Sequence, residues 1–285
     1  MSETNSALTV REVHKRFRRT EALRGCSFDV ERGSITALVG ANGAGKSTLM
    51  SIAVGLLEPD AGEVTVLGRR PGRNGIVPGL AYVAQHKPLY HGFSVADILL
   101  FGEKSNTRWD NDYATSLVAE AQIPLSARVK TLSPGQRARV ALALALGRRP
   151  DVLLLDEPLA ELDPLARRSV VRTLMTDAAE RGTTIVLSSH VLSEVAEIAD
   201  QLVILGSGRT RLTGALDDLL DEHYLLTGTS DPAGVIDGGS VVESRHRTHL
   251  VRGPRPASTD GWRVESPNLD DIVLAYLTTT DEEAA

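Results

Sequence analysis

A glycine-rich segment that ends in a lysine and two hydroxyl residues is the clearest candidate for chemistry in this chain. It follows an apolar run at residues 35–39, opens a helical pattern, and consists of Gly40, Ala41, Asn42, Gly43, Ala44, Gly45, Lys46, Ser47 and Thr48. Glycines let the backbone wrap closely around phosphate groups, so that successive N–H groups and the helix N-terminus face the anion. In a loop of this pattern the lysine reaches the β- and γ-phosphates of a nucleotide, and the next hydroxyl binds Mg²⁺. The segment therefore predicts an ATP site, with Thr48 placed to reach the α-phosphate.

Two adjacent carboxylates, Asp156 and Glu157, end the apolar run at residues 152–155. Nucleotide-hydrolysing proteins place an acidic residue at the end of such a strand, where it holds Mg²⁺ directly or through water. We assign that role to Asp156. Glu157 is then aimed at the water that attacks the γ-phosphate, as a general base or as a positioning group. Alone, the pair is equally compatible with helix capping or an exposed surface, but together with the phosphate loop it predicts hydrolysis.

The elements that must position these residues follow an α/β pattern. Apolar segments bounded by turn signals alternate with helical patterns over residues 8–220, which predicts a sheet covered by helices. The clearest buried strands are residues 35–39, 152–155 and 184–187. Ligands of open α/β sheets bind beyond the carboxyl ends of the strands. The phosphate loop and the carboxylates are therefore expected at one edge of the same sheet.

Shorter segments predict further strands around this sheet. Residues 8–10 and 27–30 have the pattern of a separate antiparallel sheet. Residues 202–205 and 210–212, joined through Gly206 and Gly208, predict a hairpin.

The chain also changes character along its length. Residues 90–147 are mainly helical in pattern, which predicts a helical insertion. From residue 222 the sequence turns to short strands split by Gly and Pro, followed by a final helix with Ser266 as its predicted cap and Pro267 at its first position. We expect a nucleotide-binding domain at residues 1–221 and a small α+β accessory subdomain at residues 222–285.

Composition limits the classes of protein that the chain can represent. Its 285 residues are 42% hydrophobic and 24% charged, as in ordinary globular proteins. The longest apolar run, residues 140–146, is far short of the ~18 residues that a membrane-spanning helix needs. The N-terminus lacks a basic start followed by an apolar stretch, so we expect a cytoplasmic protein without a secretory signal. A net charge of −6 argues against a nucleic-acid partner.

A further motif narrows the choice among ATPases. It precedes an alanine- and leucine-rich helical pattern and consists of Leu132, Ser133, Pro134, Gly135 and Gln136. This segment resembles the signature motif of ATP-binding cassette (ABC) proteins. The resemblance implies a P-loop NTPase with a RecA-like core sheet, an antiparallel β subdomain and a helical signature subdomain. It also implies that Ser133, Gly135 and Gln136 contact ATP held by a second copy, so that two head-to-tail chains enclose two nucleotides.

Other residues match family motifs in the family's order along residues 7–220. Phe17 matches the aromatic residue that stacks on adenine, and Gln85 matches the glutamine that contacts Mg²⁺ and water. Asp163 closes the loop that communicates between subunits, and His190 matches the histidine that contacts the γ-phosphate. The resemblance thus implies a catalytic group of Glu157, His190 and Gln85, and a Mg²⁺ site made by Ser47, Gln85 and Asp156.

Three departures from the family pattern affect individual contacts. Pro134 replaces the usual first glycine of the signature pair, which removes one N–H donor and restricts φ. Phe17 stands where tyrosine is commoner, although stacking is retained. Ala160 and Glu161 replace a commoner Ser-Ala pair, which puts hydrogen bonding across the dimer in question.

The family resemblance implies the ATP-hydrolysing subunit of an ABC transporter, using ATP and Mg²⁺. Its implied partners are a second copy and a separate integral membrane permease, and its implied location is the cytoplasmic face of the membrane as a peripheral protein. The segment after Gln85, including His86, Pro88, Leu89 and Tyr90, resembles the surface that receives a permease. Residues 266–277 look like the C-terminus of drug and multidrug exporter subunits, which favours export of a hydrophobic or drug-like substrate.

Two other classes remain open at this point. The first is a soluble ABC-type ATPase that acts in cofactor assembly, translation or DNA repair. The segment between Lys46 and Asp156 is too short for the long coiled coils of the repair class, and the translation class resembles two cassettes in one chain. The second is a module that senses ATP without hydrolysing it, which would lack Glu157.

Overall fold

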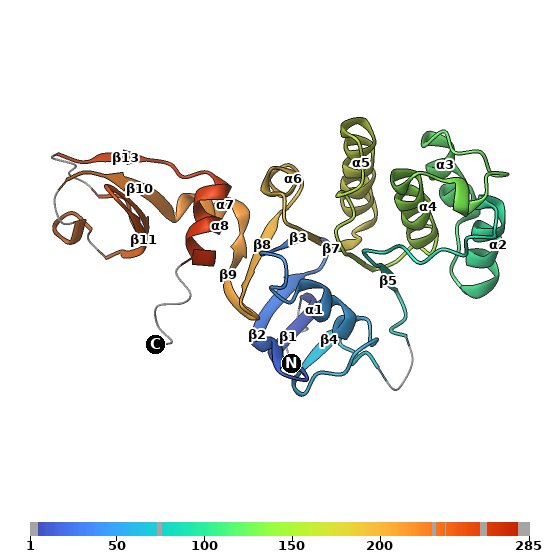
Figure 1. Cartoon of the computed structure of the whole chain (residues 1–285), viewed down its shortest axis with the longest axis horizontal. Coiled ribbons are helices and arrows are strands. Elements are labelled where there is room, and N and C mark those ends of the chain that lie inside the picture. Colours follow the sequence, from blue (N-terminus) through green and yellow to red (C-terminus); the bar gives the residue numbers. More distant parts are fainter. Residues whose placement is uncertain (1–4, 73–75, 230–231, 237, 257–260, 279–285) are drawn as a thin grey trace.

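The computed structural model describes residues 5–72, 76–229, 232–236, 238–256 and 261–278. A six-stranded sheet forms its centre, with a three-stranded and a four-stranded sheet beside it. In Figure 1, helices from the middle of the chain gather at one end of the molecule, and the four-stranded sheet lies at the opposite end. The α/β fold expected from the sequence is confirmed.

The central sheet brings strands from distant parts of the chain together. Across the sheet, the order is β5 (Leu80–Val83), β6 (Val152–Leu155), β7 (Thr184–Ser189), β3 (Ile35–Val39), β8 (Gln201–Gly206) and β9 (Arg209–Ala215). Strands β5 to β8 pair in parallel, and β9 returns antiparallel to β8. Every residue of β3, β6 and β7 is buried, as expected for strands covered on both faces. The carboxyl ends of these three neighbouring strands therefore lie side by side.

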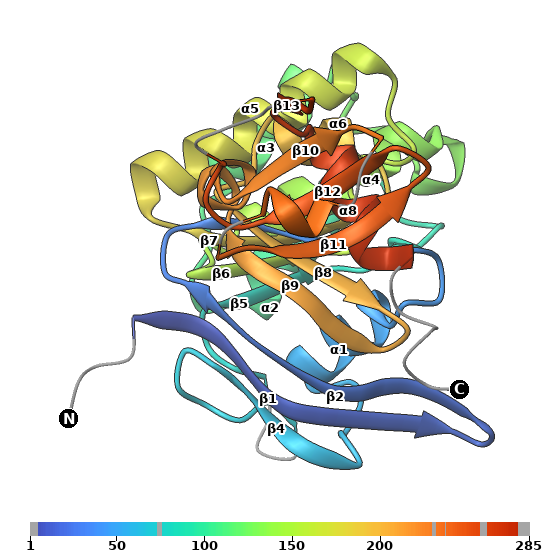
Figure 2. The same cartoon turned by 90° about the vertical axis from the view of Figure 1, so that its left-hand side faces the viewer.

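An antiparallel sheet covers the first helix of the chain. It consists of β2 (Thr20–Glu31), β1 (Ser6–Phe17) and β4 (Ala61–Val66), and the helix is α1 (Lys46–Ala53). Leu8 and Val10 of β1 share a hydrophobic core with Leu49 of α1 and Leu38 of β3. Figure 2 shows this sheet alongside the central one. The antiparallel sheet predicted from the sequence is confirmed, with strands longer than predicted.

The helical segment between β5 and β6 packs against one end of the central sheet. Its helices are α2 (Val95–Ser105), α3 (Asn111–Glu120) and α4 (Pro134–Leu146). Val140 and Leu146 of α4 lie in the same hydrophobic cluster as Leu153 and Leu155 of β6. Burial of this face therefore joins the helical segment to the strand that carries the carboxylate pair.

Three further helices follow β6, two of them between strands of the central sheet and the third after its last strand. They are α5 (Pro164–Arg181), α6 (Leu192–Ala196) and α7 (Leu216–Asp221). Asp163 caps α5 by accepting the N–H groups of Leu165 and Ala166, and Gly182 ends it in a left-handed conformation. Such caps satisfy backbone groups that have no partner within the helix.

The C-terminal part adds a small sheet and returns to the centre. The sheet has the order β11 (Ser240–Arg245), β12 (Thr248–Arg252), β10 (His223–Thr227) and β13 (Arg263–Glu265), and it is followed by α8 (Leu269–Thr278). Ile272 and Val273 of α8 share a core with Leu202 and Ile204 of β8. The proposed boundary after residue 221 thus separates two sheets, while α8 packs across it.

The cap predicted for the final helix is wrong. Helix α8 begins at Leu269 and not at Pro267. Asn268 Oδ1 accepts the N–H of Asp271, and Asp271 Oδ2 accepts the N–H of Asn268. Ser266 Oγ instead accepts a hydrogen bond from Arg255. Asn268 and the carboxylate three residues later satisfy two helix N–H groups reciprocally, which a serine two residues earlier cannot do.

Replacing Asn268 by alanine should lower the free energy of unfolding by about 1 kcal/mol, because the N-terminus of α8 loses its capping acceptor. Ser266→Ala is the matched control, and its effect should stay within about 0.5 kcal/mol. Chemical denaturation of both variants measures the difference. A larger loss for Ser266→Ala than for Asn268→Ala contradicts the assigned cap.

Candidate functional site

The glycine-rich loop joins β3 to α1 with little space for side chains. Gly45 has φ 106°, and a Cβ at this position would lie 2.6 Å from the carbonyl oxygen of Ala22 and 2.7 Å from Leu23 Cδ2. Only glycine adopts this conformation at such a close approach without strain. The N-terminus of α1 follows directly, so its unpaired N–H groups and positive dipole end face the loop.

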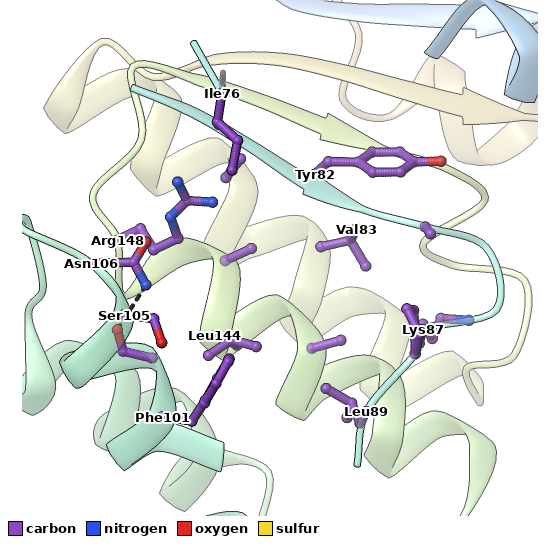
Figure 3. Close-up of a pocket in the computed structure, with 16 residues that line it drawn as sticks. Ile76, Tyr82, Val83, Lys87, Leu89, Phe101, Ser105, Asn106, Leu144 and Arg148 are labelled. Carbon is purple, nitrogen blue, oxygen red and sulfur yellow. Dashed lines mark hydrogen bonds between the residues drawn. The ribbon is translucent and has the colours of Figure 1, made fainter. Parts of the chain in front are cut away.

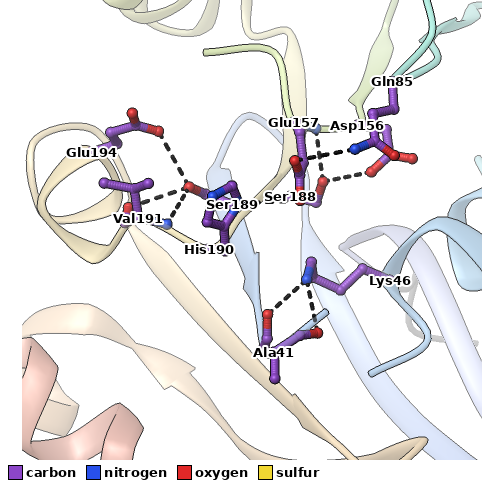
Figure 4. A network of polar contacts seen from close by, with 11 residues as sticks. Ala41, Lys46, Gln85, Asp156, Glu157, Ser188, Ser189, His190, Val191 and Glu194 are labelled. Atoms are coloured by element: carbon purple, nitrogen blue, oxygen red, sulfur yellow. Dashed lines mark hydrogen bonds and ion pairs between the residues drawn. The ribbon is translucent and has the colours of Figure 1, made fainter. Parts of the chain in front are cut away.

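Lys46 is buried at the start of α1, and its ammonium is held by the loop itself. Its Nζ donates to the carbonyl oxygens of Gly40 at 2.7 Å and Ala41 at 3.2 Å (Figure 4). Burial lowers the pKa of Lys46, while the nearby carboxylates of Glu157 and Asp156 oppose that shift. A positive charge is thus concentrated where the phosphates of a nucleotide are expected.

An open pocket of about 500 Å³ lies over this loop. The sequence-predicted residues that line it come from four parts of the chain, and they are Asn42, Gly43, Ala44, Gly45, Lys46, Ser47, Thr48, Gln85, Glu157 and His190. Ala22 of β2 completes the lining, and no sequence motif indicated this residue. The structure therefore brings the predicted phosphate loop and the predicted catalytic group to one pocket.

Glu157 contacts both of the other predicted catalytic residues. Gln85 Nε2 donates to its Oε2 at 3.3 Å, and His190 Nδ1 lies 3.2 Å from its Oε1. Glu157 itself has φ 49°, a left-handed conformation that is uncommon outside glycine. Such conformations persist where surrounding contacts determine them, and they cluster at functional sites.

Ser188 supplies those contacts, and sequence analysis gave it no role. Its buried hydroxyl accepts the N–H of Glu157 at 2.9 Å and donates to Oδ1 of Asp156 at 2.7 Å (Figure 4). One hydroxyl thus holds both carboxylate residues. The sequence places Ser188 near the end of a predicted strand, but it does not show that β7 is adjacent to β6.

The environment of Asp156 suits a carboxylate that binds a cation. It is 2% exposed, and the one hydrogen bond to its side chain among the described residues comes from Ser188. Ser47 is exposed on the first turn of α1, beside Lys46. Mg²⁺ prefers oxygen ligands and is commonly held by one or two carboxylates together with substrate phosphates. Asp156, the Ser47 hydroxyl and the Gln85 amide oxygen are therefore suitable ligand types.

A second serine and a buried glutamate support His190. Ser189 Oγ accepts the N–H of Val191 at 3.0 Å and donates to Oε2 of Glu194 at 3.2 Å. Arg167 of α5 pairs with the other Glu194 oxygen at 3.0 Å. The backbone on both sides of His190 is thus tied to α5, which sequence analysis did not anticipate.

The other predicted site residues lie outside this pocket. Phe17 is at the end of β1 and 43% exposed, and Lys15 Nζ lies 5.7 Å from its ring centroid. Asp163 accepts two α5 N–H groups, and these hydrogen bonds lower its pKa. Ser133, Gly135 and Gln136 belong to the N-terminus of α4. Gly40, Ala41 and Asp156 lie close to lining residues along the chain but do not line the pocket themselves.

The N-terminus of α4 is organised by a reciprocal cap. Ser133 Oγ accepts the N–H of Gln136 at 3.2 Å, and Gln136 Oε1 accepts the N–H of Ser133 at 3.0 Å. Pro134 occupies the first turn of the helix. Its missing N–H belongs to the groups that lack an intrahelical partner, and its fixed φ suits this position. The proline therefore fits the helix locally, while it leaves one fewer donor for an anion.

A family model described as ABC transporter matches residues 23–160. A sulfate/thiosulfate import ATP-binding protein of Pseudomonas putida is 31% identical over 262 residues, which cover 86% of this chain and 79% of that protein. The chain belongs to the ABC transporter family. Nod factor export ATP-binding protein I of a Bradyrhizobium species (strain SNU001) is 36% identical over 297 residues, covering 96% of this chain and 97% of that protein.

Solved structures of the family share the fold. The structure of an ATP-binding subunit of an ABC transporter matches with a TM-score of 0.69 and 29% identity, over 75% of this chain and 92% of that one. This chain is therefore an ATP-binding subunit of an ABC transporter, an ATPase whose hydrolysis is coupled to transport. Across the described residues, no helix combines the length and the apolar character required to span a membrane.

Replacing Glu157 by glutamine should lower steady-state ATP hydrolysis at least about 100-fold, because the group that orients or deprotonates water loses its charge. Phosphate release measures this loss. Binding of a fluorescent ATP analogue should persist, since the Lys46 loop is unchanged. Glu120→Gln, an exposed substitution on α3, is the matched control. Full turnover in Glu157→Gln contradicts the role of Glu157.

Replacing Ser188 by alanine should reduce kcat about tenfold with a smaller change in KM, because Glu157 loses the acceptor that holds its left-handed backbone. The variant should also lose about 1–3 kcal/mol of unfolding free energy, since a buried N–H and a buried carboxylate lose a partner. Steady-state kinetics and chemical denaturation measure the two effects. Lower stability with unchanged kcat would restrict Ser188 to a structural role.

Proposed function

We propose that the chain powers an exporter as a homodimer beneath a separate integral membrane permease. In this proposal, two copies associate head to tail and enclose two ATP molecules. Each nucleotide lies between the phosphate loop of one copy and the N-terminus of α4 of the other. The exported substrate is hydrophobic or drug-like, and the subunit is peripheral to the cytoplasmic face of the membrane.

The C-terminal residues support the direction. Residues 266–277 look like the C-terminus of drug and multidrug exporter subunits. Family membership alone leaves the direction open, because import and export subunits are both similar to this chain. The covered share of the relatives does not separate the two types, since an export protein of Rhizobium etli is covered to 71% and the Pseudomonas import protein to 79%.

Hydrolysis depends on positioning more than on covalent chemistry. The Lys46 ammonium leaves the carbonyls of Gly40 and Ala41 and binds phosphate oxygens. Ser47, Gln85 and Asp156 would hold Mg²⁺, which would neutralise charge on the phosphates. Glu157, whose backbone is held by Ser188, orients the attacking water and accepts its proton. His190 contacts the γ-phosphate next to Glu157. Gln85 donates to the same carboxylate.

The distribution of predicted contacts supports a second copy. Ser133 and Gly135 lie at the N-terminus of α4, and neither lines the pocket that contains Lys46 of the same chain. The helix end offers the Gly135 N–H and a positive dipole end, which suits a phosphate. A second copy provides that phosphate. Asp163 lies at the start of α5 on the loop that the dimer encloses, and Phe17 stacks on the adenine beyond the pocket lining.

A second pocket supplies a surface for the permease. It has a volume of about 330 Å³ and lies between the segment after β5 and helices α2 and α4 (Figure 3). Leu89, Phe101 and Leu144 contribute apolar side chains to its wall. The exposed rings of Tyr90 and Phe101 meet edge to face at a centroid distance of 5.9 Å. Exposed apolar groups gathered around a hollow mark interaction sites, and a permease segment is the occupant we assign.

Transport by inside-out membrane vesicles tests the direction. Vesicles that contain the chain and its permease should accumulate a hydrophobic fluorescent substrate when ATP is added, because the cytoplasmic face is outside. Lys46→Ala should abolish accumulation, since the charge that binds the phosphates is removed, and it should weaken binding of a fluorescent ATP analogue about 100-fold or more. ATP-driven release from preloaded inside-out vesicles would overturn the proposal in favour of import.

A further inference from the structure

Lys87 is a buried lysine with a strained backbone outside the nucleotide pocket. Its side chain is 4% exposed, and its Nζ lies 2.7 Å from Oε2 of Glu161, whose side chain is 47% exposed. The residue has φ 43° in the turn after β5, where its N–H donates to Ala84 and its carbonyl accepts from Leu89. L-residues adopt this left-handed conformation at an energetic cost. The lysine side chain therefore points into the protein, and its backbone is strained.

Stability does not explain such a lysine. Removing an ammonium group from water is costly, and a well-packed apolar residue often stabilises the same position as well or better. The best-attested role of a buried ionic contact is to specify one conformation among several. The Lys87 contact specifies the conformation of the loop that contains Glu161.

That loop presses against the N-terminus of α4. A Cβ on Gly135 would lie 3.2 Å from the carbonyl oxygen of Glu161 and 3.5 Å from Leu162 Cδ2. Leu162 is buried in the same cluster as Leu132 and Ala138, which flank this helix end. A shift of this loop is therefore expected to displace the start of α4, because the loop and the helix end pack in one hydrophobic cluster.

Lys87 also contributes to the wall of the 330 Å³ pocket, where Figure 3 shows it beside Leu89. The same side chain therefore contacts the proposed permease surface and, through its ammonium, the loop before Asp163. Glu161 is one of the positions at which the chain departs from the family pattern, so the acidic partner is a feature of this sequence.

We propose that Lys87 is a positioning residue that, through Glu161, sets the N-terminus of α4 for the ATP of the second copy. The proposal rests on the proposed function for the role of Ser133 and Gly135. It adds a connection, through Lys87 and Glu161, between the wall of the 330 Å³ pocket and the N-terminus of α4.

The test uses Lys87→Met in the Glu157→Gln background, where the ATP-bound dimer accumulates. Met has similar length and is tolerated in apolar surroundings. The protein concentration for half-maximal dimer formation with ATP should rise about tenfold. Binding of a fluorescent ADP analogue to the single chain should stay within about twofold, because the Lys46 loop is untouched. Sedimentation velocity and fluorescence titration measure the two quantities.

Lys104→Met is the matched control, because Lys104 pairs with Glu103 in an exposed contact on α2. It should leave dimer formation unchanged. Glu161→Gln should weaken the dimer as Lys87→Met does, and the double variant should be no weaker than Lys87→Met alone, since both remove one contact. Glu161 is half exposed, so this second variant keeps the test available if Lys87→Met unfolds.

The outcomes separate the two proposals. If the Glu157→Gln chain binds ATP but never dimerises, the proposed head-to-tail function fails and the inference fails with it. If it dimerises, and Lys87→Met or Glu161→Gln dimerises at the same concentration, Lys87 does not position α4 and only the inference is overturned. Additive losses in the double variant would also overturn it, since independent effects exclude a shared contact.

Discussion

The parallel pairing of β6, β7 and β3 is the constraint on which the site depends. Because these strands are neighbours, Asp156 and Glu157, Ser188, and the glycine-rich loop leave the sheet at the same edge. Ser188 then joins two of the three strand ends through one hydroxyl. A buried hydroxyl with both a donor and an acceptor partner has little freedom to reorient. The backbone at Glu157, the proposed catalytic residue, is thus held by a neighbouring strand of the sheet.

Three residues with positive φ lie in segments that follow strands of this sheet. Gly45 follows β3, Lys87 follows β5 and Glu157 follows β6, and all three have positive φ. Glycine is free of strain at the first position, whereas a lysine and a glutamate are strained at the other two. The strain is maintained by hydrogen bonds at Glu157 and by an ion pair at Lys87. Contacts with the rest of the fold therefore hold Glu157 and Lys87 in backbone conformations that are unfavourable in an isolated chain.

Sequence patterns were sufficient for the buried strands and the phosphate loop, because continuous apolar runs and glycine spacing are local signals. They did not reveal Ser188, Glu194 or the Lys87–Glu161 ion pair, since each of these contacts joins elements that are distant in the sequence. The cap of α8 was misassigned for a different reason. Ser266 and Asn268 are both acceptable cap types, and only the backbone geometry at Asp271 distinguishes them.

The N-terminus of α4 limits what a single chain can do. Ser133 and Gln136 cap one another, and Pro134 lacks an N–H, so the donors that remain for an anion are few. Gly135 is confined by the carbonyl of Glu161 and cannot gain a side chain without displacing that loop. A helix end with few donors binds phosphate productively only when it is placed accurately, because each remaining hydrogen bond carries more of the interaction. Accurate placement of α4 by a buried ion pair is therefore most valuable in a chain that has proline in this motif.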